Sequence, residues 1–186
     1  MANARAKSEL PRDLDAFVRW HEQQPETFEF VGGAPVMMAP ASRAHTMLKG
    51  NVFATLRQAL EGTRCTAYGD GIEIRAHGVS AIPDVLVSCA PPDLSTPVEA
   101  APVLIVEIVS PTTALRDRVQ KWEAYRRIPS LRHYLMVEQE RRLVELHTRK
   151  SALVFEERFI ETGEVPLDAL GVTLDVAAIY AGVING

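Results

Sequence analysis

The chain has few of the features that mark several common protein classes. Its 186 residues include two cysteines, Cys65 and Cys89, with no second pair for a cysteine zinc site. No stretch approaches the roughly 18 consecutive apolar residues that a membrane span needs. The first ten residues lack the apolar core of a secretory signal. These absences favour a cytoplasmic protein without a membrane partner, in which both cysteines are buried thiols rather than a disulfide.

Length and charge set further bounds. A chain of 186 residues, with 47% apolar and 24% charged residues, predicts one soluble domain over residues 1–186. A net charge of −4 argues against a protein that coats nucleic acid non-specifically. Residues 112–150 nevertheless carry ten Lys and Arg against five Asp and Glu. This basic segment is either a phosphate-facing patch or a salt-bridged surface.

Apolar periodicity and turn signals predict a mixture of helices and strands. The predicted helices span residues 11–23, 44–60, 110–127 and 176–180. The predicted strands span residues 27–31, 34–38, 64–68, 72–75, 84–88, 103–109, 133–138, 142–148 and 153–159. Gly32-Gly33 marks a hairpin between the first two strands.

The segment from residue 103 to residue 138 predicts a crossover unit. Its first strand is a continuous apolar run, and Ser110-Pro111 then supplies a helix cap and a proline suited to the first helical turn. A strand, a helix and a second strand in this order predict a parallel pair. The fold class is therefore α/β or α+β, with a mixed central sheet flanked by helices.

Glu107 is the residue that points to chemistry. It interrupts the apolar run of residues 103–109, and an ionised carboxylate buried there needs a cation or strong hydrogen-bond donors. Asp84 begins a neighbouring strand, and Lys121 lies on the following helix. Two carboxylates and a lysine on adjacent elements indicate a divalent-metal site for phosphodiester cleavage. The alternatives are an ion pair of Glu107 with an arginine and a strand-start role for Asp84.

The helix after Glu107 has two distinct sides. Its solvent side is expected to carry Arg116, Gln120, Glu123 and Arg127, spaced four, three and four residues apart. At 100° per residue, the opposite side carries Arg118, Lys121, Trp122 and Tyr125. Lys121 is thus predicted to point toward the sheet. The alternative is a surface pair of Lys121 with Asp117, one helical turn away.

Several motifs occur in a distinctive order. They are Met38-Ala-Pro-Ala-Ser-Arg-Ala-His45, Ile82-Pro-Asp84-Val-Leu-Val, Val106-Glu107-Ile-Val-Ser-Pro-Thr112, Asp117-Arg-Val-Gln-Lys121-Trp-Glu-Ala-Tyr125 and Ile128-Pro-Ser-Leu-Arg-His-Tyr134. This ordered set resembles the Uma-two family of restriction-endonuclease-like proteins, a branch of the PD-(D/E)xK nuclease superfamily. The resemblance covers about residues 13–182.

The resemblance implies a restriction-endonuclease-like core with a defined site. Asp84 and Glu107 would be ligands of Mg²⁺ or Mn²⁺, Lys121 the catalytic lysine, and DNA the substrate. The superfamily pattern usually places lysine two residues after the glutamate, where this chain has Val109. The lysine therefore has to come from the helix.

Further residues are candidates for supporting roles. His45 occupies the histidine position of the family pattern, and either supports the metal shell or packs as a core histidine. Tyr125 either hydrogen-bonds in the site or packs, and Arg118 is a candidate nucleic-acid contact together with Lys121. Asp70, between two glycines, is read as a turn residue, and Ser110 as a helix cap.

Two functions from different classes follow. The first is a metal-dependent DNA endonuclease that acts through Asp84, Glu107 and Lys121. The second is a catalytically silent domain that keeps the fold for nucleic-acid binding or assembly. Symmetric cleavage of duplex DNA would favour a homodimer.

Overall fold

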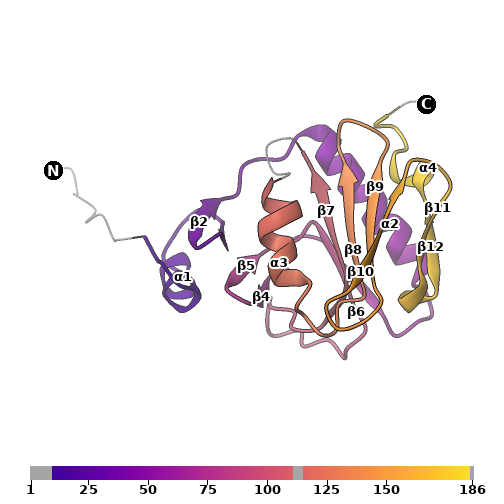
Figure 1. Cartoon of the computed structure of the whole chain (residues 1–186). Coiled ribbons are helices and arrows are strands. Elements are labelled where there is room, and N and C mark those ends of the chain that lie inside the picture. Colours follow the sequence, from indigo (N-terminus) through magenta and orange to yellow (C-terminus); the bar gives the residue numbers. More distant parts are fainter. Residues whose placement is uncertain (1–9, 111–114, 185–186) are drawn as a thin grey trace.

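The centre of the computed structural model is a six-stranded mixed sheet (Figure 1). The structure describes residues 10–110 and 115–184. In the sheet, β7 and β8 are parallel and the other neighbours are antiparallel. Its strands, in spatial order, are β10 (Phe155–Ile160), β9 (Val144–Arg149), β8 (His133–Glu138), β7 (Pro102–Val109), β6 (Val85–Ser88) and β3 (Thr66–Tyr68).

The parallel pair confirms the predicted crossover. Strand β7 leads into the wide helical turn η1 (Arg116–Lys121), which has π-helical geometry, and then into α3 (Trp122–Tyr125). The chain returns through β8, which lies beside β7 in register from Leu104 opposite His133 to Val109 opposite Glu138. The predicted helix start at Pro111 lies outside the described residues.

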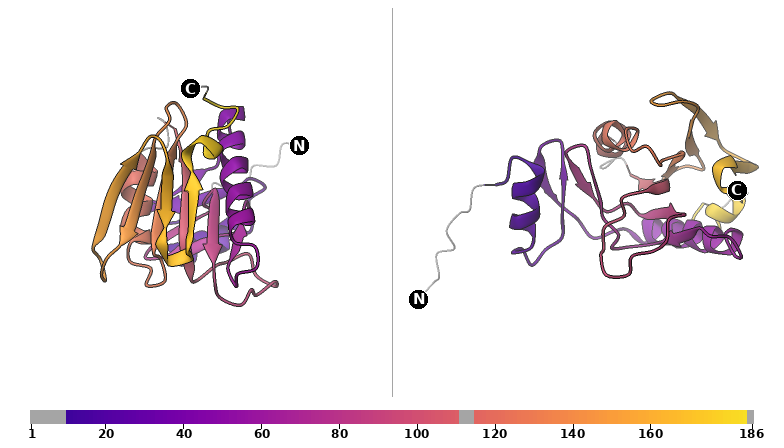
Figure 2. Two further views of the ribbon diagram at one scale, coloured as in Figure 1. Left: turned by 90° about the vertical axis from the view of Figure 1, so that its right-hand side faces the viewer. Right: turned by 90° about the horizontal axis from the view of Figure 1, so that it is seen from below.

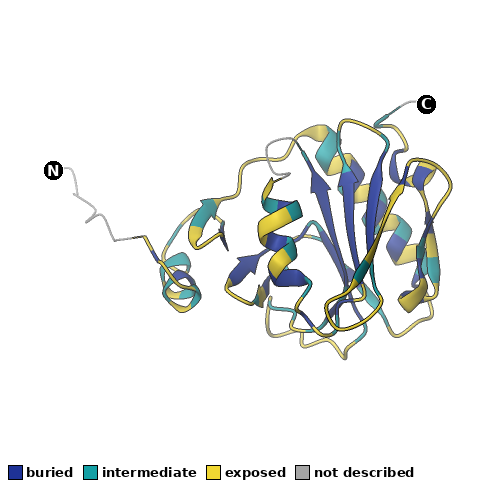
Figure 3. Ribbon diagram, viewed as in Figure 1, coloured by how far each residue is buried: buried dark blue, intermediate teal, exposed yellow. Residues whose placement is uncertain are grey.

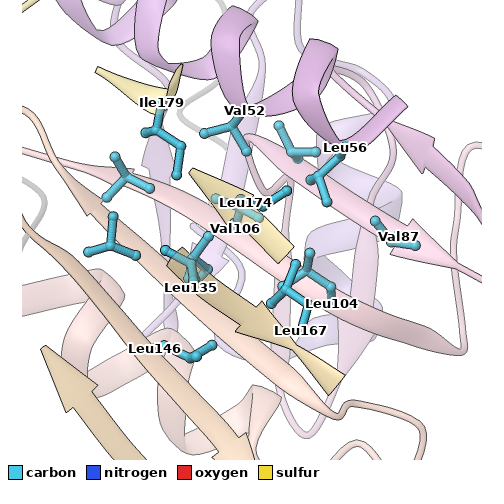
Figure 4. Close-up of a cluster of buried hydrophobic side chains, with 14 of the residues drawn as sticks. Val52, Leu56, Val87, Leu104, Val106, Leu135, Leu146, Leu167, Leu174 and Ile179 are labelled. Carbon is cyan, nitrogen blue, oxygen red and sulfur yellow. The ribbon is translucent and has the colours of Figure 1, made fainter. Parts of the chain in front are cut away.

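Helices cover both faces of this sheet. Figure 2 shows α2 (Arg43–Ala59) on one side and the η1–α3 segment on the other. Helix α2 begins at the cap Ser42, whose side chain accepts a hydrogen bond from the His45 amide at 3.1 Å. Its apolar stripe of Leu48, Val52 and Leu56 is fully buried against the sheet, as its spacing predicts (Figure 4). Each such side chain contributes about 1.5–3 kcal/mol by leaving water.

The C-terminal segment completes the layer around α2. It consists of β11 (Glu164–Leu167), the short 3-10 turn η2 (Asp168–Leu170), β12 (Val172–Asp175) and α4 (Val176–Ile179). Apolar residues of the β11–β12 hairpin and α4 join the core beneath α2. The predicted helix at residues 176–180 is confirmed, but the sequence pattern did not predict the hairpin.

A smaller four-stranded sheet carries the N-terminal region. Its order is β2 (Ala34–Met37), β1 (Phe28–Val31), β5 (Val79–Ala81) and β4 (Ile74–Ala76), and α1 (Leu14–His21) packs on β1. The hairpin about Gly32-Gly33 is as predicted. Gly32 has φ +64, and a Cβ there would lie 2.9 Å from Gln120 Nε2 of η1. Glycine therefore lets the hairpin approach η1 closely.

The prediction for the cysteines was wrong. Cys65 and Cys89 form a disulfide, with Cα atoms 4.0 Å apart. Cys65 precedes β3 and Cys89 follows β6, and these strands pair with Thr66 opposite Ser88. The antiparallel register thus places the cysteines across from each other. Composition alone does not reveal this register.

The burial pattern confirms the predicted class. Strands β6 to β9 are buried on both faces, whereas the edge strand β10 and the outer sides of the helices are exposed (Figure 3). The protein is a mixed α+β structure with a central sheet between helices, as expected. None of the helices in the described ranges has the length and apolar character needed to cross a membrane.

Candidate active site

Glu107 lies inside the sheet on the face that η1 and α3 cover. Only 5% of its side chain is exposed. Its Oε1 lies 3.1 Å from Lys121 Nζ and accepts a hydrogen bond from the Tyr125 hydroxyl at 3.3 Å. The helix therefore supplies the donors that a buried carboxylate requires. The predicted inward direction of Lys121 and Tyr125 is confirmed.

Lys121 is shared among three carboxylates. Its Nζ lies 3.0 Å from Glu29 Oε1, 3.1 Å from Glu107 Oε1 and 3.3 Å from Asp117 Oδ1. All four side chains are at most 5% exposed. The alternative pair of Lys121 with Asp117 thus exists, but inside the site rather than in solvent. Sequence reasoning missed Glu29, which comes from β1 of the smaller sheet.

Burial and charge shift the proton affinities in this cluster. Burial raises the pKa of Glu107; Lys121 opposes this, and the carboxylates of Asp117, Asp84 and Glu29 add to it, so the pKa lies well above 4.5. Burial would lower the pKa of Lys121, but Glu107, Glu29 and Asp117 outweigh it and hold that pKa well above 10.5. Burial followed by the charge of Glu107 raises the pKa of Tyr125 well above 10.0. Lys121 is thus charged and Tyr125 is a neutral donor at neutral pH.

Asp84 lies opposite Glu107 on the neighbouring strand. It directly precedes β6, and Val85 is opposite Val106 of β7, so the next position of the register places Asp84 opposite Glu107. Asp84 Oδ2 accepts a hydrogen bond from the Ile108 amide at 2.8 Å. Its Oδ1 lies 2.7 Å from His45 Nε2, at the first turn of α2. The prediction that the strands of these two carboxylates are neighbours is confirmed.

These residues line one cavity of about 850 Å³. Its lining comes from both sheets, α2, η1, the connection between β2 and α2, and residues 139 and 140 after β8. The charged and histidine side chains that line it are Glu29, His45, Lys49, Asp70, Asp84, Glu107, Arg116, Asp117, Lys121 and Glu140. A space of this size is sufficient for a substrate group, and Glu107 and Lys121 contact each other at its lining.

Arg118 lies differently from its expected role. Arg118 donates to the carboxylates of Glu138 and Glu145 and does not line the cavity in the described part of the chain. Its contact with nucleic acid remains a prediction. The Arg118 guanidinium already pairs with two carboxylates. Asp70 lies in a turn, as predicted, and also lines the cavity, with its Oδ1 2.6 Å from Lys49 Nζ.

The inner cluster carries a charge imbalance. Glu29, Asp84, Glu107 and Asp117 face the fixed cations Lys121 and Arg116, whose NH1 lies 3.7 Å from Glu29 Oε2. With all four carboxylates ionised, the excess is two negative charges. A divalent cation would balance it, and protonation of Glu107 balances half of it. The oxygen donors fit Mg²⁺ or Mn²⁺, which prefer carboxylates and water.

The architecture is that of a known nuclease fold. A crystal structure of a protein from Anabaena variabilis, described as "a putative nuclease belonging to DUF820", superimposes with a TM-score of 0.72. The match covers 94% of this chain and 100% of that one, at 15% sequence identity. The fold is of the restriction-endonuclease type.

The sequence places the chain in a family. Residues 14–177 match the family model Uma2, described as "Putative restriction endonuclease", and the chain belongs to this family. An uncharacterized protein of Synechocystis is 27% identical over 174 residues, covering 90% of each chain. A second one from the same organism is 30% identical over 128 residues, covering 66% of this chain and 72% of that protein. The family predicted from the motifs is confirmed.

Proposed function

We propose that this protein is a metal-dependent DNA endonuclease, with Asp84, Glu107 and Lys121 as its catalytic residues. The observation that carries the proposal is that Asp84 and Glu107 lie opposite each other in a cavity whose inner carboxylates, when all are ionised, exceed the nearby fixed cations by two charges. The family description and the nuclease fold support nucleic acid as the substrate. DNA is the member of that class that restriction endonucleases act on.

Asp84 and Glu107 would hold Mg²⁺ or Mn²⁺ through carboxylate oxygens. When bound, the ion lowers the pKa of a water ligand and stabilises the negative charge that develops on the phosphate. Asp84 is held in place by the Ile108 amide and His45, and each of its oxygens keeps a lone pair for a ligand. His45 is therefore a positioning residue, which fixes the direction of the Asp84 carboxylate.

Lys121 would act on the phosphate or the attacking water rather than on the ion. Its ammonium is already oriented by Glu29 and Asp117, so it needs little reorganisation when a substrate enters. Tyr125 donates to Glu107 and fixes the rotation of its carboxylate. Duplex cleavage at symmetric positions would use a homodimer, which remains a prediction.

Cleavage and metal binding together test this proposal. Plasmid DNA, single-stranded DNA and RNA are incubated with Mg²⁺ or Mn²⁺, and Mn²⁺ binding is measured by calorimetry. Wild type is expected to cleave DNA and bind the ion, Glu107→Ala and Asp84→Asn to lose both, and Lys121→Met to lose cleavage while retaining most of the binding. Lys121→Arg should not restore full cleavage, because a planar fork cannot replace a compact ammonium.

The matched control is Glu161→Gln, an exposed carboxylate on the loop after β10. It should cleave as wild type does. Cleavage that survives in Glu107→Ala would assign the activity to a contaminant. Absence of both cleavage and Mn²⁺ binding in wild type would instead favour the silent domain, in which the contacts of Lys121 with Glu29, Glu107 and Asp117 are structural.

A further inference from the structure

A second group of potential metal ligands lies on the same face of the sheet, away from the cavity. It consists of Glu145 and His147 on β9 and Glu157 on β10, and one ligand atom from each lies within 4.8 Å of the others. His147 Nε2 is buried and has no hydrogen-bond partner in the described residues. A buried polar atom without a partner is uncommon and calls for an explanation.

The sheet register brings the three side chains together. Glu145 and His147 are two residues apart on one strand, so they point to the same face. Glu157 is directly opposite His147 on β10, and its Oε1 lies 3.5 Å from His147 Nε2. Directly opposite residues also share a face. The backbone therefore holds one imidazole and two carboxylates in the arrangement of a three-ligand chelate.

The surroundings of His147 keep its nitrogen available as a ligand. Its ring lies 4.6 Å from the Trp122 ring and 6.0 Å from that of Tyr134, measured between centroids. Burial lowers the pKa of His147, although Glu157 and Glu145 oppose this effect. The imidazole is thus neutral at neutral pH, and a neutral imidazole offers a lone pair to a metal.

Charge and access also fit a cation. Glu145 is bound by Arg118, which also contacts Glu138, but each carboxylate oxygen has two lone pairs and can accept Arg118 and a metal together. Arg118 is paired with both Glu138 and Glu145, and Glu157, which lies 3.5 Å from His147, adds a further carboxylate to the group. The Glu157 side chain is 47% exposed, so an ion can enter from solvent.

We infer that Glu145, His147 and Glu157 form a binding site for a divalent transition-metal ion, with Zn²⁺ as the physiological ion of best fit. One imidazole and two carboxylates suit Zn²⁺ better than Mg²⁺, which prefers oxygen ligands alone. The ion would join the edge strand β10 to β9 and so stabilise this side of the sheet. In cross-strand register, Met136 lies between Glu107 and Glu145, so this site is about 10 Å from the cavity cluster, two strand spacings.

Trp122 provides a natural reporter for this site. The chain has two tryptophans, and the other, Trp20, lies in α1 beside the smaller sheet. An untagged Trp20→Phe, Glu107→Gln protein, stripped of metal, isolates the new site from the proposed nuclease site. Zn²⁺ is titrated by calorimetry, and Cu²⁺ by quenching of Trp122 fluorescence.

We expect one Zn²⁺ per chain and strong quenching by Cu²⁺ in this background. His147→Gln and Glu157→Gln should weaken binding by more than about 100-fold, since residues that merely support a ligand are worth about 10- to 100-fold. Glu156→Gln is the matched control, because the Glu156 carboxylate is adjacent to Glu157 in sequence but pairs with Lys150 at 2.7 Å and is not one of the three ligands. It should bind as the background does.

A second readout does not depend on a substitution at the site. Nitrogen NMR of the histidine side chains should show a shift of His147 Nε2 when Zn²⁺ is added to the folded background protein. The inference is overturned if no Zn²⁺ binds, if His147→Gln binds equally well, or if the NMR shift falls on another histidine. Because Glu107 is already replaced, each of these outcomes is independent of whether the protein cleaves DNA.

Discussion

The pH dependence of stability in Glu107→Gln tests the buried carboxylate cluster most directly. In the metal-free protein, burial, with the carboxylates of Asp117, Asp84 and Glu29 acting against Lys121, holds the pKa of Glu107 well above 4.5. The folded state therefore keeps a proton that the unfolded chain releases. Such a group contributes stability that is fully present below pH 4.5 and is lost as the pH rises toward the folded pKa. The loss is about 1.4 kcal/mol per pH unit.

Glutamine cannot release this proton, so the variant should not show the loss. The difference in free energy of unfolding, variant minus wild type, is expected to grow by about 1.4 kcal/mol per pH unit from pH 5 up to the folded pKa. The contributions of His133 and His147 cancel in this difference. Their lowered pKa values make the free energy of unfolding fall as the pH falls below about 6.5, and they do so in both proteins. Urea unfolding at pH 5, 6 and 7 with a chelator measures it.

Glu161→Gln is the control, and its difference from wild type should stay constant with pH. The reasoning is refuted if the Glu107→Gln difference is also constant and the variant is less stable by roughly 3–5 kcal/mol throughout. That result would mean that Glu107 is ionised in the metal-free protein and forms a stabilising pair with Lys121.

Three further predictions concern the metal, the disulfide and one buried hydroxyl. Mn²⁺ at a hundred times its Kd should raise the free energy of unfolding of wild type by about 2.7 kcal/mol, reversibly with a chelator, and leave Glu107→Gln unchanged in calorimetry. Replacing Cys65 and Cys89 by serine should cost about 3.5 kcal/mol in urea unfolding, because the disulfide closes a loop with a sequence separation of 24. Tyr180→Phe should cost about 1–3 kcal/mol by thermal unfolding, because the hydroxyl accepts from the Leu143 amide at 3.0 Å and the change leaves that buried amide unpaired.

Elements defined by local patterns were predictable from the sequence. The apolar run with one glutamate identified β7, and the stripe of Leu48, Val52 and Leu56 identified α2. The inward direction of the Lys121 side chain was also predictable, because it depends only on the pattern of residues in its own helix. Local periodicity sets which way each of these side chains points, and the structure retains that direction.

Features that depend on pairing between distant segments were not predictable. Glu29 alternates with Phe28 and Phe30 on β1, a pattern that reads as an outward polar residue until the smaller sheet docks against η1. The disulfide depends on the register of β3 with β6. Arg118 was correctly placed off the solvent stripe, but its contacts with Glu138 and Glu145 depend on how β8 and β9 pair and how η1 packs on them, which the sequence does not specify.

The position of the lysine follows from the packing around β7. Val109, two residues after Glu107, is fully buried in the core beneath α3 together with Ala124 and Tyr125. A lysine at residue 109 would replace these apolar contacts with a second buried charge, at a cost of several kcal/mol. Lys121 reaches Glu107 from the helix on the same face of the sheet, and there its ammonium also contacts Glu29 and Asp117. The departure from the usual spacing thus keeps the lysine in the site and leaves the core beneath α3 apolar.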